Sequence, residues 1–417
     1  MIEIELYIIQ NFFLIIIFII FRKILLNINL VFLNYFFLIF TIISIISFTH
    51  FKFEKNNQFN NEKNGELFEK NYFDNLILNF KPDIYHIIPD GLLNVNELTN
   101  YGYNNSAELY NKIKSSDLKY FEKSLTNYPA TFFSISSTLN GSLFNENLNF
   151  YEEQINKTIY NSKLHNLLIK NNYKIFWYKT RWIGANCNAK KYKCMNNSFY
   201  NNEIFNNYLL LLNFSQAWID KILYKFFKFQ KKFHLDALSN DLDLILLEKK
   251  PRYVFGYLNL PHGPYTVDKN CTPIITKNLK QNIIFKKKHY FEQVDCFAKQ
   301  LNIFTEKLKK NNNRPYIVIV QSDTGWSFNP KLIEEGRPNP KHPERLWPDT
   351  QFKNFLAISK NFNCIDNKGK ISNADLFPTI LNCLNNKEVN HNNNKKFDVY
   401  YSSHPKHGKI YYRSDLD

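Results

Sequence analysis

The chain has 417 residues, and 44% of them are hydrophobic, so it can bury a large core and is not expected to be disordered. Its formal net charge is +16, but the 53 lysine and arginine residues are spread along the chain. No zinc-finger, RNP or basic-region pattern accompanies this charge, so we do not expect nucleic-acid binding. Length alone permits one large domain or two smaller ones.

Two long apolar stretches, residues 4–21 and 24–48, open the chain and are separated by Arg22 and Lys23. The second stretch is long enough to cross a bilayer. The first residues are not basic and no small residues follow the stretch, so the pattern is not typical of a cleaved signal peptide. We expect a transmembrane helical hairpin within residues 1–50, with a single membrane anchor as the alternative.

A cytoplasmic turn at Arg22 and Lys23 would place both ends of the hairpin outside the cytoplasm. The expected location is therefore the cell inner (plasma) membrane, with the large domain on the extracytoplasmic side. The six cysteines fit an oxidising compartment. Cys187 and Cys194 share a short polar loop and could form a disulfide or remain free thiols, and the other four show no metal-binding spacing.

Residues 51–79 are polar and charged and predict a tether, which leaves residues 80–417 as the main domain. Short, continuously apolar segments predict strands buried on both faces, at residues 83–90, 174–178, 253–260, 316–322 and 354–359. Apolar side chains at steps of three and four predict an amphipathic helix over residues 291–308. Strand, helix and strand in this order indicate an α/β domain with a mostly parallel central sheet flanked by helices.

Residues 205–233 form another apolar segment that ends in several lysines. A helix of the main domain with a solvated basic face is the preferred interpretation, and a helix on the membrane surface is the alternative.

One segment, residues 127–141, places small hydroxyl side chains at the start of an apolar-periodic run. Pro129 cannot continue a helix from behind, and Gly141 ends the run, so the helix is expected to begin near Thr131. Free N–H groups and the positive end of the helix dipole would then favour an anion beside Thr131. The alternative is a capped helix of the core.

Three predicted strands end in side chains that can bind metals or protons: Asp90, His262 and Asp323. In a parallel sheet these ends share one edge, where Thr131 could join them. Two carboxylates and a threonine oxygen suit a divalent cation, which would lower the hydroxyl pKa and make Thr131 a nucleophile. His262 could bind or protonate the oxygens of an ester.

This ordered pattern resembles the alkaline phosphatase and sulfatase superfamily, in particular its bacterial membrane-anchored sulfatase-like branch, over most of residues 80–385. The matching segments are weak singly and fairly specific in their common order. They are residues 90–91, 127–131 with 134–140, 260–264 with Asp268, 290–294, 322–325, 344–345 before 354–357, and 375–381.

The resemblance implies a sulfatase-like fold with Asp90, Thr131 and Asp323 as ligands of one divalent metal ion (Zn, Mn, Mg or Ca). It implies Thr131 as nucleophile and His262 as a second catalytic residue. The reaction implied is hydrolysis or transfer at phosphate or sulfate esters of envelope glycans or lipids. Because Thr131 replaces the Cys or Ser that sulfatases convert to formylglycine, phosphoryl chemistry is favoured over sulfate hydrolysis.

The sequence departs from the family pattern at Thr324, where a metal-binding histidine is expected. An oxygen-rich site could still bind Mg²⁺, Mn²⁺ or Ca²⁺. His342, His404 and His407 are candidate replacements, although each is also typical of an ordinary loop.

Thr324 motivates an alternative function, in which a catalytically degenerate sulfatase-like protein binds an envelope glycan or partner without turnover. A third hypothesis is a membrane-bound structural protein of unrelated fold. The sequence neither indicates nor excludes a homodimer.

Overall fold

The structure is a computed structural model, and the chain divides into two compact units, residues 1–65 and 66–417. The described residues all belong to the second unit: 67–68, 73, 76–178, 183, 187–195, 234–263, 265, 267–272, 274, 283–328, 348–362, 364–386, 398–402 and 408–413. The predicted membrane hairpin and the segment 205–233 lie outside them. Within this described part, no helix combines the length and the apolar character that a membrane span requires.

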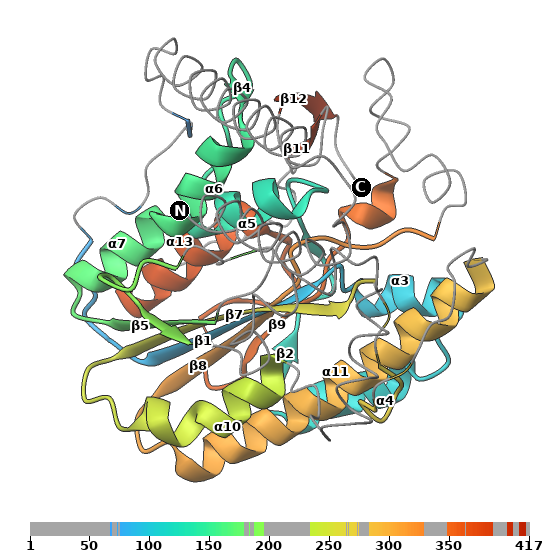
Figure 1. The fold of residues 1–417 in the computed structure, drawn as a ribbon, viewed down its shortest axis with the longest axis horizontal. Coiled ribbons are helices and arrows are strands. Elements are labelled where there is room, and N and C mark those ends of the chain that lie inside the picture. Colours follow the sequence, from blue (N-terminus) through green and yellow to red (C-terminus); the bar gives the residue numbers. More distant parts are fainter. Residues whose placement is uncertain are drawn as a thin grey trace, which may run out of the picture. The chain divides into compact units, whose positions relative to one another are not determined.

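A sheet of seven strands forms the centre of this unit, in the order β2-β9-β8-β1-β7-β5-β6 (Figure 1). Their bounds are β1 Asp83–Asp90, β2 Leu118–Tyr120, β5 Lys174–Tyr178, β6 Lys193–Met195, β7 Arg252–Pro261, β8 Tyr316–Gln321 and β9 Leu356–Ser359. The neighbours from β8 to β6 pair in parallel, whereas β9 is antiparallel to both β8 and β2. The predicted, mostly parallel α/β sheet is therefore confirmed.

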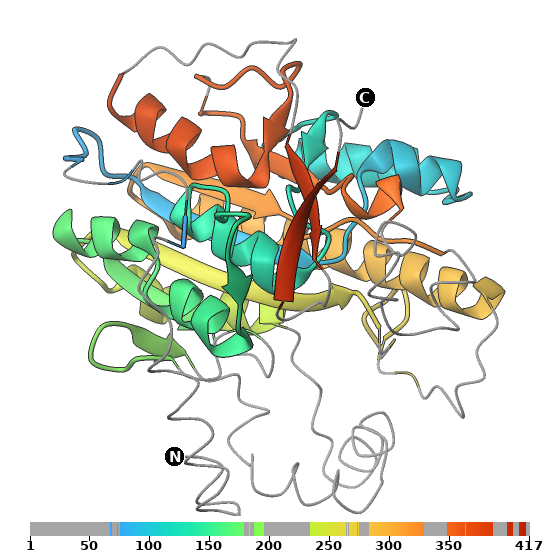
Figure 2. The same cartoon turned by 90° about the horizontal axis from the view of Figure 1, so that it is seen from above.

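Helices cover both faces of the sheet (Figure 1). One face carries α5 Thr131–Asn140, α6 Glu152–Tyr160, α7 Lys163–Lys170 and α13 Asn373–Leu384. The other carries α3 Val95–Asn100, α4 Ser106–Ser115, α10 His234–Leu246 and α11 Ile283–Asn311. The predicted amphipathic helix lies within α11. Viewed from above, α5 and α13 lie together over the sheet (Figure 2).

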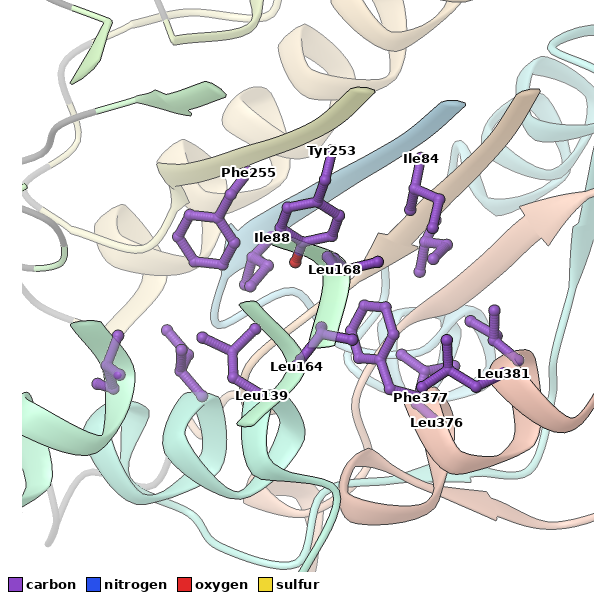
Figure 3. Close-up of a cluster of buried hydrophobic side chains, with 14 of the residues drawn as sticks. Ile84, Ile88, Leu139, Leu164, Leu168, Tyr253, Phe255, Leu376, Phe377 and Leu381 are labelled. Carbon is purple, nitrogen blue, oxygen red and sulfur yellow. The ribbon is translucent and has the colours of Figure 1, made fainter. Parts of the chain in front are cut away.

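Each face of the sheet packs into its own core because successive strand residues point to opposite sides. In β1, Ile84 and Ile88 face α5, α7 and α13, whereas Tyr85 and Ile87 face α10 and α11. Figure 3 shows the first of these cores, where Tyr253 and Phe255 of β7 join the two isoleucines. Burial on both faces accounts for the continuous apolar strands, since each large side chain contributes about 1.5–3 kcal/mol.

Short elements complete the described part. They are a two-stranded sheet of β3 Ser124–Leu125 and β10 Ile371–Ser372, a three-stranded sheet of β4 Asn149–Phe150, β11 Val399–Ser402 and β12 Gly408–Arg413, and the 3-10 helix η3 Asp349–Gln351.

Side chains from the predicted tether also pack in the first core, since Phe68, Phe73 and Leu78 are buried there. The ring of Phe73 lies against Gly141, which ends α5 with a φ of 59°. A Cβ at this position would overlap that ring, so both the left-handed backbone and the close approach require glycine.

All six cysteines are paired, as Cys187–Cys194, Cys271–Cys296 and Cys364–Cys383. The first pair confirms the disulfide that the sequence left open against free thiols. The second pair joins α11 to the segment that follows β7. Sequence spacing did not predict this pairing, because its two cysteines lie 25 residues apart.

Candidate active site

The candidate site lies at the edge where β1, β7 and β8 all end. These strands are neighbours and parallel, so Asp90, His262 and Asp323 meet there as the sequence pattern implied. The backbone N–H of His262 donates to the Asp90 carbonyl at 3.1 Å. The N–H of Gly91 donates to Asp323 Oδ1 at 2.9 Å. Side chains more than 230 residues apart in sequence therefore share one small volume.

Thr131 reaches this edge as the first residue of α5. Ala130 precedes it in extended conformation and provides no side-chain cap, so the first N–H groups of the helix have no capping side chain. Thr131 is partly exposed, and its hydroxyl acts to lower the pKa of both Asp323 and Tyr257, so it lies near both groups. The helix dipole therefore adds positive potential beside a hydroxyl that lies near a carboxylate.

The Asp323 carboxylate is 1% exposed, and its Oδ2 atom has no hydrogen-bond partner in the described part of the chain. Burial, and then the nearby charge of Asp90, raise the pKa of Asp323 to about 7. A cation between the two carboxylates would relieve both effects and fill the coordination of the unpaired oxygen. Asp323 is thus the clearest sign of a cation site among the described residues.

Tyr257 is a site residue that the sequence interpretation missed. It lies in β7 and is 1% exposed, and both Asp90 and Thr131 lie near enough to its hydroxyl to affect its pKa. Burial holds the pKa of Tyr257 well above its usual 10. A buried tyrosine needs a partner for its hydroxyl, but the sequence alone does not show which groups that hydroxyl meets.

A polar network fixes the loop that carries Asp323. The Ser134 hydroxyl donates to the Asp323 carbonyl at 2.5 Å, and the Asn373 side chain donates to the same carbonyl at 3.1 Å. The Asn354 side chain donates to the Ser322 carbonyl at 2.6 Å and to Asn373 Oδ1 at 2.8 Å. Because α5, α13 and the segment before β9 all contribute, the carboxylate stands on rigid elements.

The turn after β1 is held in the same way. Gly91 adopts a φ of +66°, and its carbonyl accepts from the Tyr290 hydroxyl at 2.7 Å. A Cβ on Gly91 would lie 3.4 Å from the Trp326 ring and 3.6 Å from the His262 ring. The turn therefore needs glycine for its backbone conformation and brings both rings next to Asp90.

His262 presents one ring nitrogen to the site. Its Nδ1 lies 2.5 Å from the Gly263 carbonyl, which only accepts, so Nδ1 carries the hydrogen. In the neutral ring, Nε2 then holds the lone pair. The ring packs edge-on against Trp326 with centroids 4.5 Å apart. His262 can accordingly accept a proton at Nε2, or donate one when charged.

Other predicted residues do not add a ligand. Thr324 is buried, and the Asp268 carboxylate accepts the N–H groups of Asn270 and Thr272 within its own turn. His342, His404 and His407 lie outside the described residues. Across the described ranges, no cluster of three or more His, Cys, Asp or Glu side chains could hold a metal. The donors at the site are thus mainly oxygen atoms.

Comparisons with known proteins agree with the fold. The sequence model of the family described as Sulfatase matches residues 93–386. No curated protein matches the chain. Among solved structures, the C-terminal periplasmic domain of EcEptC from Escherichia coli, in complex with Zn, is 13% identical and has a TM-score of 0.51. The alignment covers 85% of this chain and 96% of that domain.

Two further solved structures are similar at lower scores. The C-terminal periplasmic domain of phosphoethanolamine transferase EptC from Campylobacter jejuni is 14% identical, with 76% and 92% coverage and a TM-score of 0.49. The soluble domain of lipooligosaccharide phosphoethanolamine transferase A from Neisseria meningitidis is 13% identical, with 76% and 93% coverage and a TM-score of 0.47.

At such identities, structural likeness shows the fold alone. The family match is a stronger finding, because it spans more than half of the chain. The chain therefore belongs to the sulfatase family and is an enzyme of the phosphoryl- or sulfuryl-transfer type.

Proposed function

We propose that the protein is a membrane-anchored, metal-dependent transferase or hydrolase that acts on phosphate esters of envelope glycans or lipids through Thr131. The observation that carries this proposal is the pair of carboxylates, Asp90 and Asp323, beside the Thr131 hydroxyl at the start of a helix. The helix N-terminus favours a bound phosphate or sulfate group, and the carboxylates supply negative charge for a cation.

The donor set fits a hard divalent cation. Asp323 Oδ2 is buried and unpaired within the described structure, and Asp90 and Thr131 add two more oxygen donors. Asp90, Thr131 and Asp323 would hold the ion, and Mg²⁺, Mn²⁺ or Ca²⁺ suits oxygen ligands better than Zn²⁺ does. When bound, the ion would supply positive charge that lowers the hydroxyl pKa and offsets charge on the transferred group.

Each residue then has a role that follows from its position. Thr131 Oγ1 attacks the phosphorus of the ester, which bonds to Thr131 as the leaving alcohol departs. The N–H groups at the start of α5 orient the phosphate oxygens. His262 Nε2, when protonated, donates a hydrogen bond to those oxygens or to the leaving oxygen. Transfer to water or to a second alcohol would restore the threonine.

The predicted membrane hairpin over residues 1–50 would place the site on the extracytoplasmic side, where envelope lipids and glycans are found. The three disulfides support this compartment, because disulfides persist in oxidising spaces. The fold shared with a periplasmic domain of EcEptC is consistent with the same location.

The test uses the full chain in detergent with an aryl phosphate, an aryl phosphodiester and an aryl sulfate, each with Mg²⁺, Mn²⁺, Ca²⁺ or Zn²⁺. We expect a phosphate substrate to react fastest. Thr131→Ala should lower kcat by at least about a thousandfold, and Thr131→Ser, which keeps a hydroxyl, should retain measurable turnover. Mass spectrometry should find the transferred group on Thr131. Unchanged turnover in Thr131→Ala would exclude this residue as nucleophile.

A further inference from the structure

One side of helix α11 contacts two of the turns that form the site. Tyr290, Gln293 and Cys296 follow one another at steps of three along this helix, and all three side chains are fully buried. The first two belong to the segment 290–294 that matches the family pattern, and the proposed reaction gives them no role. Their contacts indicate what this segment does.

Tyr290 holds the turn that follows β1. Its hydroxyl donates to the Gly91 carbonyl at 2.7 Å and accepts the N–H of Leu93 at 3.1 Å. Asp90 comes directly before Gly91 in the chain. The backbone next to Asp90 is therefore tied to α11.

Gln293 holds the turn that follows β7, residues 261–263, which we call the His262 turn. Its side-chain Nε2 donates to the Pro261 carbonyl at 2.9 Å and to the His262 carbonyl at 3.2 Å. Carbonyl oxygens only accept, so the NH₂ group of the amide must face them. These carbonyls belong to the two peptide groups that flank the His262 Cα. Gln293 thus fixes the backbone from which the imidazole projects.

A disulfide ties the same segment to α11 a second time. Cys296 lies about one turn after Gln293 and is bonded to Cys271, nine residues after His262. The helix is itself anchored, because Val294 and the apolar side chains that follow it pack into the core on that face of the sheet. A histidine on a loop is therefore held by a rigid element.

We propose that Gln293 is a positioning residue of this enzyme: it holds the two peptide groups around His262 so that the imidazole Nε2 stands at the oxygens of the ester. The inference rests on the proposed function, in which His262 donates a hydrogen bond or a proton to those oxygens. Gln293 is fully buried and does not contact the ester. Because it acts through His262, its removal slows the reaction only while the imidazole is present.

The same helix provides a matched control in Gln300, two turns after Gln293. Gln300 is 2% exposed, and its Nε2 donates to Asp236 of α10 at 3.0 Å. Methionine is similar to glutamine in length and has no donor, so Gln293→Met and Gln300→Met each remove one buried amide from α11. Only the first removes contacts with the His262 turn.

The experiment is a double-mutant cycle on the kcat of the full chain, with the aryl phosphate or phosphodiester that the wild type turns over. His262→Ala should lower kcat by about a hundredfold or more. Gln293→Met should lower it by about 10- to 100-fold in the wild type, but by less than about twofold in His262→Ala, which has no imidazole to position. Gln300→Met should keep kcat near the wild-type value.

A general loss of structure would act with or without His262. An equal factor for Gln293→Met in both backgrounds would therefore overturn the inference, as would an unchanged kcat or the same loss in Gln300→Met. Thermal unfolding checks that the two methionine variants are comparably stable. If Gln293→Met does not fold, Gln293→Asn, which draws the amide back by one methylene, replaces it in the same cycle.

Failure of the proposed function gives a different result, since the wild type would then be inactive, or Thr131→Ala or His262→Ala would be as active as the wild type. Crystal structures of the wild type and Gln293→Met decide the positioning without turnover. A displaced His262 ring in Gln293→Met supports it. The same ring position in both proteins overturns it.

Discussion

The two ends of strand β1 carry buried carboxylates in opposite situations. At the start of the strand, Asp83 is fully buried and forms an ion pair with Arg252 of β7 at 2.9 Å, and the arginine side chain is only 3% exposed. At the end of the strand, Asp90 lies near a second carboxylate, Asp323, and its charge raises the Asp323 pKa. At the start of β1 an arginine balances the charge of the buried carboxylate, and we call this the compensated end. At the end of β1 two carboxylates lie together, and we call this the uncompensated end.

This difference separates a structural group from a functional one. Burial raises the pKa of Asp83, but the charge of Arg252 opposes the shift, so the pair can stay ionised inside the fold. Burial also raises the pKa of Asp323, and there the second charge adds to the shift. Two nearby carboxylates repel each other and do not stabilise the fold, so their arrangement indicates a site for a cation.

The largest expected effect comes from breaking the compensated end. Arg252→Met leaves the Asp83 carboxylate buried without its partner and should lower the free energy of unfolding by about 3–5 kcal/mol. Urea unfolding of the full chain, followed by tryptophan fluorescence, measures this loss. Asp83→Asn with Arg252→Met removes both charges and should recover much of it. A loss below about 1 kcal/mol in the single variant would show that water reaches this end of the sheet.

The uncompensated end predicts a pH dependence of the opposite sign from ordinary paired carboxylates. The pKa of Asp323 lies near 7 in the fold and at 3.8 in the unfolded chain, so the folded form holds the proton more tightly. Its contribution to stability is complete below about pH 4 and is lost as the pH rises towards 7. The loss amounts to at most about 4 kcal/mol.

Urea unfolding between pH 4 and 7.5 in EDTA compares wild type with Asp323→Asn and Asp90→Asn. The advantage of Asp323→Asn over wild type should grow as the pH rises. In Asp90→Asn the same dependence should weaken, because the neighbouring charge that raises the Asp323 pKa is gone. If the free energy of unfolding depends on pH in the same way for wild type and Asp323→Asn, the ionised Asp323 does not destabilise the fold, and the two ends of β1 do not differ as argued.

Much of this arrangement was accessible from the sequence. The five apolar segments and the helix over residues 291–308 predict the parallel sheet, because burial on both faces leaves a continuous apolar signature. Asp90, His262 and Asp323 follow directly from strand ends, since parallel strands bring their carboxyl ends to one edge. Thr131 follows from the proline and the apolar period around it.

What escaped prediction depends on side chains that meet only in three dimensions. Nothing in the local sequence pairs Asp83 with Arg252, which lies 169 residues later. Tyr257 has the sequence signature of any aromatic residue in a buried strand, and only the fold brings its hydroxyl near Asp90 and Thr131. The antiparallel direction of β9 is likewise a property of how the chain returns to the sheet, and a short apolar strand has the same sequence signature in either direction.

A bound cation should balance the charges of Asp90 and Asp323, as Arg252 balances the charge of Asp83 at the other end of β1. A metal bound at a hundred times its Kd stabilises the fold by about 2.7 kcal/mol. We therefore expect Mn²⁺ or Mg²⁺ to raise the Tm of the wild type by several degrees and EDTA to reverse the rise. Asp323→Asn should show little response, whereas Asp83→Asn, although less stable, should respond as the wild type does. Equal metal responses in both variants would place the bound ion elsewhere.

The smallest expected effect concerns Thr324, which stands where the family pattern has histidine. Thr324 lies next to Asp323 and is 3% exposed, so an imidazole there would enter a packed region while adding a nitrogen donor. If the oxygen donors of Asp90, Thr131 and Asp323 already suffice, Thr324→His should change Mn²⁺ affinity by less than about tenfold and should mainly improve Zn²⁺ binding. Isothermal titration with each metal measures this. If the wild type binds neither ion and Thr324→His binds Zn²⁺ tightly, the threonine has abolished metal binding at this site. Asp90 and Asp323 would then no longer serve catalysis. The alternative function, a catalytically degenerate protein that binds an envelope glycan or partner without turnover, would be the better description.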